Sequence, residues 1–245
     1  MDASIALFAA GTGYLIGSIS FARVLGRWLA PGERFRTTTI AWGDDRGFEV
    51  ENVSATTIAK RRGPAYGCLT ALLDILKATI PVLVFRMLYP QGSYHVICAA
   101  AVIAGHNLPI YYGFKGGRGT STLMGSLLVL DPLSMPVTIF LGYVIGLFVF
   151  KDVLLAHHAG WILILPFWFA LRGRWDLVIF SLIVNLLRWS VSLPEIRTYL
   201  AYRRSGEFKT REFHEAIEQT HIGFIHKLLR RRGWIKYDYM ETNAT

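Results

Sequence analysis

The chain has 245 residues, of which 53% are hydrophobic and 18% charged, and its formal net charge is +9. A typical soluble domain carries about a quarter charged residues, and several apolar blocks here reach the ~20 residues that a helix needs to cross a bilayer. This composition excludes an ordinary soluble protein, and it argues against nucleic acid as the partner because the Lys and Arg residues lie between and after the apolar blocks.

The apolar blocks predict an all-α integral membrane protein with about seven transmembrane helices. The N-terminal block lacks the positive start of a cleaved secretory signal, so we expect it to be a permanent span. Its glycines, Gly11, Gly13 and Gly17, predict one face packed closely on another helix. The fourth helix is short for a full crossing and is expected to be tilted or buried among its neighbours. The predicted segments are Ser4–Ala30, Pro64–Tyr89, Ser93–Tyr112, Thr120–Leu130, Leu133–Phe150, Val153–Leu171 and Trp175–Val191.

The Lys and Arg residues between the spans set the expected orientation, because cytoplasmic loops carry the excess of positive charge. An external N-terminus places the basic polar loop from Pro31 to Gly63 inside, together with Lys115, Arg118 and the basic C-terminal region. Only Arg172 and Arg174 break this pattern. We therefore expect the N-terminus outside and the C-terminus inside.

The chain is expected to divide into a seven-helix transmembrane domain, residues 1–192, and a basic cytoplasmic tail, residues 193–245. In the tail, Phe213, Ile217, Phe224, Leu228 and Leu229 fall near helical spacing beside a basic run. This pattern favours a surface helix on anionic membrane lipids, and a solvated, partly disordered tail remains the alternative.

A glycine-rich hinge from Gly113 to Gly119 is the most informative stretch. Glycine at three of four positions, Gly116, Gly117 and Gly119, lets the backbone approach a ligand closely. The helix that follows directs its free N–H groups to the same place, and Lys115 and Arg118 add positive charge. The hinge therefore predicts a phosphate-binding loop at the cytoplasmic face, while a flexible loop with two orienting cations stays open as the alternative.

Ionisable residues inside the spans are the next candidates. Asp74 and Lys77 lie three residues apart on one helix, within reach of each other, and such residues usually face partners or an aqueous cavity. A structural pair inside the bundle is favoured over a catalytic role. His106, near the end of the third span, is a candidate base or phosphate donor, although a lone histidine there is more often a satisfied interfacial residue. The two cysteines, Cys68 and Cys98, lie in apolar blocks and are expected to be packing residues, so no metal site is expected.

Several segments, in order, resemble the bacterial acyl-phosphate-dependent glycerol-3-phosphate acyltransferases. Gly17-Ser18-Ile19-Ser20-Phe21 is similar to the family's Gly-Ser-Ile-Pro-Phe, and Asn52 to Thr57 to its Asn-Ile-Gly-Ala-Thr-Asn loop. Leu73 to Lys77 contains its Asp-Ile-Leu-Lys segment. Gly105 to Gly119 is similar to its Gly-His-Asn-Phe-Pro and Phe-Lys-Gly-Gly-Lys-Gly block, which is the longest and most specific match.

The resemblance implies transfer of a fatty acyl group from acyl phosphate to glycerol 3-phosphate, giving lysophosphatidic acid, by a multi-pass protein of the bacterial inner membrane. No cofactor is implied. The implied catalytic residues are His106, Arg118 and Asn52, with Arg118 in the place of the family's lysine. The implied substrate-binding residues are Lys115, Gly116, Gly117, Gly119, Thr56 and Lys60, where Lys60 stands for the usual arginine.

Some family positions differ in this chain. Val50 replaces a serine, Glu195 replaces an asparagine, and Glu49 and Glu51 place carboxylates where an anion is expected to bind. These replacements favour an alternative, a non-catalytic paralogue that binds lipid phosphates or regulates a true acyltransferase. A transporter of phosphorylated solutes is a third hypothesis, but it predicts broken helices in both halves, and the sequence contains one hinge.

Overall fold

The computed structural model describes the chain except for residues 30–37, 42–46, 51–52, 146–159, 205–230 and 233–245. Internal contacts divide it into two units, Met1–Thr39 with Glu49–Glu195 and Ile40–Phe48 with Ile196–Thr245. The first unit contains the helices α1 (Ala3–Gly17), α2 (Phe21–Leu29), α3 (Ala55–Arg62), α4 (Pro64–Leu88), α5 (Tyr94–Asn107), α6 (Thr120–Leu130), α7 (Ser134–Val144) and α9 (Leu165–Leu171), and α10 (Trp175–Arg204) begins in it.

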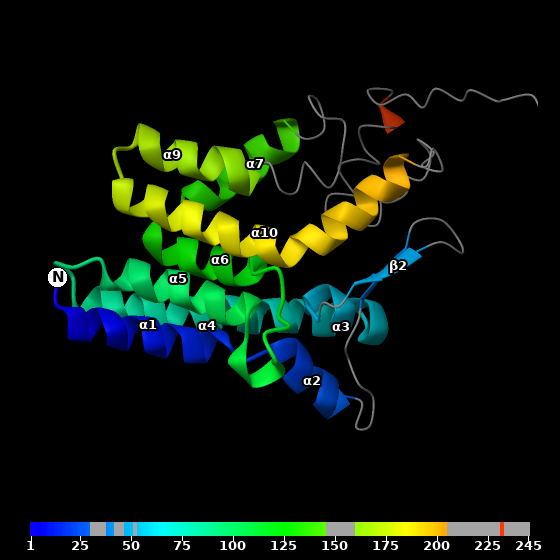
Figure 1. Ribbon diagram of the computed structural model, residues 1–245, viewed down its shortest axis with the longest axis horizontal. Coiled ribbons are helices and arrows are strands. Elements are labelled where there is room, and N and C mark those ends of the chain that lie inside the picture. The colour runs from blue at the N-terminus through cyan, green and yellow to red at the C-terminus, as the bar shows by residue number, and fades with distance from the viewer. Residues whose placement is uncertain (30–37, 42–46, 51–52, 146–159, 205–230, 233–245) are drawn as a thin grey trace, which may run out of the picture. The chain divides into compact units, whose positions relative to one another are not determined.

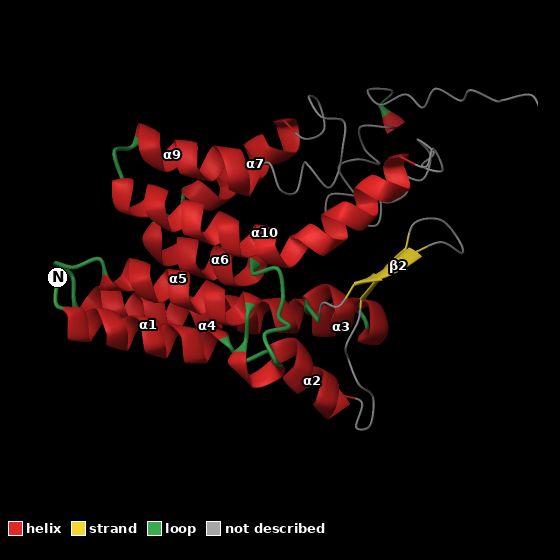
Figure 2. Ribbon diagram, in the orientation of Figure 1, coloured by secondary structure: helices red, strands yellow, loops and turns green. Residues whose placement is uncertain are grey.

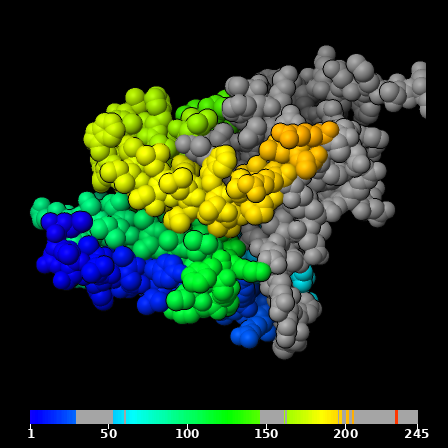
Figure 3. All heavy atoms as spheres, in the orientation of Figure 1, coloured from blue at the N-terminus to red at the C-terminus, as the bar shows by residue number. Residues whose placement is uncertain are grey.

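Three helices form the centre of this unit. Figure 1 shows α1, α4 and α5 side by side, and the contacts of each with the other two confirm this arrangement. α6 packs on α4 and α5. In the space-filling view, the atoms of α1, α5 and α10 follow one another across one face (Figure 3). The buried side chains between these helices are mainly Ala, Val, Leu, Ile and Phe, so one apolar core joins them.

The predicted first span is two helices rather than one. Asp2 caps α1 by accepting hydrogen bonds from the backbone N–H groups of Ser4 and Ile5, as expected for an aspartate at a helix start. The helix ends at Gly17, and α2 starts at Phe21. The break leaves the Ile19 carbonyl outside a regular helical ladder, and a lysine from α4 donates to it. The interruption therefore exposes a backbone acceptor inside the bundle.

The polar loop predicted from Pro31 to Gly63 also contains regular structure. Strands β1 (Thr38–Ala41) and β2 (Gly47–Val50) pair as a two-stranded sheet, and α3 follows them (Figure 2). The α3 start is a capping box, in which the Ser54 backbone N–H donates to Thr57 Oγ1 at 3.0 Å. Apart from this sheet, the regular secondary structure of the described residues is helical.

Later boundaries match in part. α4 and α6 agree with the predicted Pro64–Tyr89 and Thr120–Leu130, whereas the third span ends early, at Asn107, before the short 3₁₀ turn η1 (Ile110–Tyr112). α9 follows a π-helical turn, η3 (Gly160–Ile164). The part of the predicted Val153–Leu171 span that precedes this turn lies outside the described residues. α10 continues through Pro194 to Arg204, beyond the predicted end at Val191. The predicted surface helix of the tail, with its apolar residues, also lies outside the described residues.

Of the helices that the structure describes, three segments are long and apolar enough to cross a membrane: Ala3–Leu29, Pro64–Leu88 and Trp175–Pro194. Large apolar side chains point outward from these segments, which is the reverse of a soluble surface and typical of contact with lipid. The most exposed of them are Leu7, Phe8, Trp28, Met87, Leu88, Trp175 and Leu186.

Glycines explain how closely α1 approaches α5. A Cβ built on Gly17 would lie 2.1 Å from the Val102 carbonyl oxygen, and one on Gly105 would lie 2.1 Å from the Tyr14 carbonyl oxygen. Gly13 also faces α5, at the Cys98 carbonyl. The expectation of a packed glycine face is thus confirmed for Gly13 and Gly17. It is wrong for Gly11, which does not share their helical face: a Cβ built there would meet no described atom within 4 Å outside its own helix.

This packing predicts different effects for two similar substitutions in α1. Gly17→Ala is expected to lower the free energy of unfolding by about 1–3 kcal/mol, because the added methyl group meets backbone that cannot move away cheaply. Gly11→Ala, in open space, is expected to leave stability unchanged or slightly higher. Thermal unfolding of both variants in one detergent tests this, and equal stabilities would show that α1 and α5 do not depend on glycine contact.

Candidate functional site

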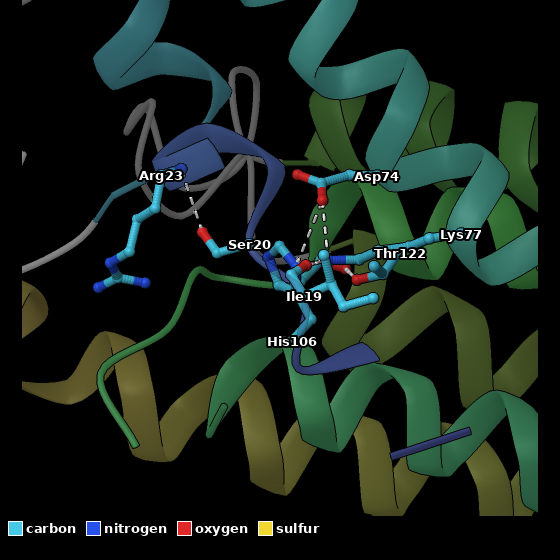
Figure 4. Close-up of polar contacts among 8 residues, drawn as sticks. Ile19, Ser20, Arg23, Asp74, Lys77, His106 and Thr122 are labelled. Carbon is cyan, nitrogen blue, oxygen red and sulfur yellow. Dashed lines mark hydrogen bonds and ion pairs between the residues drawn. The ribbon is translucent and has the colours of Figure 1, made fainter. Parts of the chain in front are cut away.

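An ion pair in the middle of α4 meets a histidine at the C-terminal end of α5. Lys77 Nζ lies 2.8 Å from Asp74 Oδ1, and both side chains are almost fully buried. His106 Nδ1 lies 2.9 Å from the same Nζ and 3.8 Å from the Asp74 oxygen. Figure 4 shows Asp74, Lys77 and His106 converging with the Ile19 carbonyl. The predicted reach between Asp74 and Lys77 is confirmed, and the structure adds His106 to the pair.

The contacts of Lys77 define the chemistry of His106. An ammonium group can donate three hydrogen bonds but cannot accept one. Lys77 Nζ forms the ion pair with the Asp74 carboxylate, donates to the Ile19 carbonyl at 2.7 Å and lies 2.9 Å from His106 Nδ1. Nδ1 therefore accepts, and the single imidazole hydrogen lies on Nε2. His106 is thereby fixed as a hydrogen-bond donor through Nε2, which favours the predicted role of phosphate donor over that of general base.

The glycine loop folds back over the end of α5 and covers this donor. The Gly117 backbone N–H donates to the His106 carbonyl at 3.1 Å. A Cβ on Gly117 would lie 2.4 Å from His106 Nε2, and one on Gly116 would lie 2.1 Å from the His106 carbonyl oxygen. The close approach of the loop to His106 thus requires glycine at both positions.

α6 begins directly after the loop. Gly119 has φ +72° and precedes the first helical residue, Thr120, so its left-handed backbone turns the chain into the helix. The first N–H groups of a helix have no intrahelical partner and favour anions. Thr122 Oγ1 donates to the Gly119 carbonyl at 3.0 Å, so its hydroxyl hydrogen is already engaged within the helix start.

Two arginines that the sequence analysis did not single out also contact the loop. Arg23 of α2 donates from Nη2 to the Lys115 carbonyl at 2.6 Å, and its guanidinium lies over the Tyr112 ring. Arg188 of α10 donates from Nη1 to the Arg118 carbonyl at 2.9 Å and to Thr120 Oγ1 at 3.1 Å. Electrostatic interactions link His106 with Lys77, Arg23 and Arg188, and Arg188 with Arg118. The site is therefore strongly positive.

A pattern in the sequence marks Arg188. Buried polar residues three or four positions apart form one face of α10, and in a membrane helix such a face points to the interior of the bundle. The regular spacing of polar residues inside an apolar helix could therefore have identified Arg188 from the sequence. The four residues are Ser181, Asn185, Arg188 and Ser192.

The structure does not assemble every predicted site residue. His106, Gly116, Gly117, Gly119 and the backbone carbonyls of Lys115 and Arg118 lie together, as described above. Thr56 is exposed on the first turn of α3 and is not among the contacts that join His106 to the loop. Asn52 and Glu51 lie outside the described residues, as do the side chains of Lys60, Glu49, Val50 and Glu195. Among the described residues, no group of His, Cys, Asp and Glu could hold a metal ion.

Comparisons with known proteins agree with the resemblance found in the motifs. A family model described as glycerol-3-phosphate acyltransferase matches residues 7–201. The glycerol-3-phosphate acyltransferase of Anaeromyxobacter sp. (strain Fw109-5) is 36% identical over 135 residues, which are 54% of this chain and 61% of that protein. That of Halalkalibacterium halodurans is 38% identical over 123 residues, which are 49% of this chain and 54% of that protein. The matches thus span less than two thirds of the length of these relatives.

Two solved structures extend the similarity to most of the fold. Both are of PlsY (YgiH), described as an integral membrane glycerol 3-phosphate acyltransferase, in its lysophosphatidic acid form and its glycerol 3-phosphate form. Each has a TM-score of 0.65 and covers 81% of this chain and 93% of its own, at 26% and 28% identity. With its long apolar helices, this chain is a membrane protein, and it belongs to the glycerol-3-phosphate acyltransferase family.

Proposed function

We propose that this protein transfers a fatty acyl group from an acyl phosphate to glycerol 3-phosphate, giving lysophosphatidic acid and inorganic phosphate. It acts at the cytoplasmic face of a bacterial inner membrane that it crosses about seven times, with its N-terminus outside. The observation that carries the proposal is the position of His106, whose Nδ1 lies 2.9 Å from Lys77 Nζ and whose Nε2 lies against Gly117 of the loop.

An acyl phosphate is an activated mixed anhydride, so the reaction needs no covalent enzyme intermediate. The glycerol hydroxyl oxygen attacks the acyl carbonyl carbon, and the bond from that carbon to the phosphate oxygen breaks. The protein has to align the two substrates and stabilise the charge on the departing phosphate. His106 Nε2–H, the N–H groups at the start of α6 and the cations Lys115 and Arg118 are suited to that task.

The hydroxyl proton also needs an acceptor. His106 Nδ1 already accepts from Lys77, so the imidazole is not placed to take the proton. Phosphate groups titrate near pH 6, so the departing phosphate is itself a base at neutral pH. We therefore assign the proton to that phosphate, with His106 as its hydrogen-bond donor. Asn52, Thr56 and Lys60 remain proposed substrate contacts on the grounds of the motif resemblance.

The test is phosphate release from palmitoyl phosphate by the detergent-purified protein, with and without glycerol 3-phosphate. Release that requires both substrates supports the proposal. Arg118→Ala is expected to lower kcat/KM by roughly 10- to 100-fold, since a hydrogen bond to a charged group contributes about 1.5–3 kcal/mol. Arg172→Gln, whose guanidinium is half-exposed and pairs with Asp131 at 2.9 Å, serves as the matched control without effect.

The replacements at Val50 and Glu195 favour a second candidate, a paralogue that binds lipid phosphates without turnover. Absence of phosphate release from protein shown to be folded would support that candidate. Undiminished turnover of Arg118→Ala would instead contradict the assignment of the glycine loop as the phosphate site.

A further inference from the structure

Arg188 occupies an unusual place for an arginine. Its side chain is 2% exposed, in the middle of a helix whose other face carries exposed leucine and tryptophan. Placing a guanidinium inside a membrane helix is costly, and such residues generally mark a functional site. Here the guanidinium lies at the start of α6, with Nη1 bonded to the Arg118 carbonyl and Thr120 Oγ1 and its carbon 5.9 Å from the centre of the Trp161 ring.

The position of Arg188 is fixed from several sides. One turn earlier on α10, Asn185 Nδ2 donates to the Trp161 carbonyl at 2.9 Å, which ties the π-helical turn to the same face. The Trp161 ring then lies near the guanidinium, and the loop carbonyl holds Nη1. A long arginine side chain can adopt many rotamers. These contacts restrict it to one, so the guanidinium is preorganised toward the loop.

Some buried polar atoms at the same place have no hydrogen-bond partner among the residues that the structure describes. Arg188 Nη2 is one, and both side-chain atoms of the fully buried Asn107 amide are others. Asn107 Oδ1 would lie 2.4 Å from a Cβ on Gly119, so the amide lies against the last glycine of the loop. A buried donor without a partner costs about 1–3 kcal/mol, and more when it is charged. An anionic oxygen at the loop would satisfy the Nη2 donor.

Charge balance supports an anion as the missing partner. Of the carboxylates that the structure describes, Asp74 pairs with Lys77, Asp131 with Arg172 and Asp176 with Arg174. Asp2 caps the far end of α1. None of these four therefore neutralises Arg188, whereas Arg118 is close enough to repel it.

We propose that Arg188 is a substrate-binding residue that holds a phosphate group at the start of α6. Nη1 fixes the loop, and Nη2 donates to a phosphate oxygen that also faces the first N–H groups of the helix. The inference rests on the proposed function in one respect: the phosphate belongs to either acyl phosphate or glycerol 3-phosphate. The two sources share their chemistry, an anionic tetrahedral group that a guanidinium fork recognises.

The experiment compares three variants of the full-length, detergent-purified protein. Arg188→Gln removes the charge, and Arg188→Lys keeps it without the fork. Arg86→Gln is the matched control, because Arg86 donates to the Val129 carbonyl near the other end of α6 and so tests loosening of this helix alone. KM is measured for palmitoyl phosphate and for glycerol 3-phosphate, and the affinity for inorganic phosphate is measured by thermal stabilisation.

Arg188→Gln is expected to raise one of the two KM values, and to weaken inorganic phosphate binding, by roughly 10- to 100-fold. Arg188→Lys is expected to give an intermediate effect, and Arg86→Gln to leave both KM values unchanged. The substrate whose KM rises identifies the source of the phosphate.

Three outcomes would overturn the inference. The first is folded Arg188→Gln with both KM values and the phosphate affinity within about twofold of the parent. The second is an equal rise for Arg86→Gln. If Arg188→Gln does not fold, Arg188→Lys is judged by the same criteria. The third outcome is then an Arg188→Lys protein with unchanged KM values and unchanged phosphate affinity. A parent protein that releases no phosphate would refute the proposed function only, since phosphate binding that depends on Arg188 would still support this assignment.

Discussion

Lys77→Met is expected to lower the free energy of unfolding by about 3–5 kcal/mol, because it leaves the buried Asp74 carboxylate without its partner. The substitution also removes the donors to the Ile19 carbonyl and to His106 Nδ1. Thermal or denaturant unfolding in detergent measures the first effect. Asp176→Asn is the control, since its pair with Arg174 is partly exposed and such pairs contribute at most about 1 kcal/mol.

A double variant separates stability from chemistry. Asp74→Asn with Lys77→Met removes both charges, so most of the lost stability is expected to return. Activity is not expected to return, because nothing then donates to His106 Nδ1, and the imidazole is free to carry its hydrogen on that atom. A double variant with full phosphate release would show that the pair is structural only and that His106 does not depend on it.

Gly117→Ala is expected to reduce kcat/KM by about 100-fold or more while the protein remains folded. The added methyl group would meet the far end of the His106 side chain, 2.4 Å away, and the imidazole can rotate to relieve that contact. A displacement of about 1 Å in an active site can reduce the rate 100-fold. Initial rates of phosphate release, with a melting curve for each sample, measure the two properties together.

Non-additivity identifies the cause of this effect. If Gly117→Ala acts by displacing the imidazole, then combining it with His106→Ala should be no worse than His106→Ala alone. Gly11→Ala is the control for an added methyl group in open space, since a Cβ built on Gly11 of α1 would meet no described atom within 4 Å. Full activity in Gly117→Ala would refute the assignment of His106 Nε2 as the donor to phosphate.

The sequence by itself determined the parts of this protein that depend on local pattern. Apolar blocks predicted the bounds of α4 and α6 within a residue, because a helix in lipid or inside the bundle carries mainly apolar side chains. The hinge glycines and the helix start that follows them were predicted as one loop, since glycine spacing and helix dipoles act over a few residues. The motif resemblance gave the family, which the family match over residues 7–201 confirmed.

Only the tertiary structure decided which distant groups meet. Lys77 donates to the carbonyl of Ile19, 58 residues earlier in the chain, because the break between α1 and α2 exposes that carbonyl. No periodic pattern in the sequence predicts the break. The hydrogen on His106 Nε2 follows from Lys77, and the role of Arg188 follows from an α10 face that packs on the loop 70 residues earlier. Such contacts depend on helix packing, and a helix records in its sequence which face is polar but not which neighbour that face will meet.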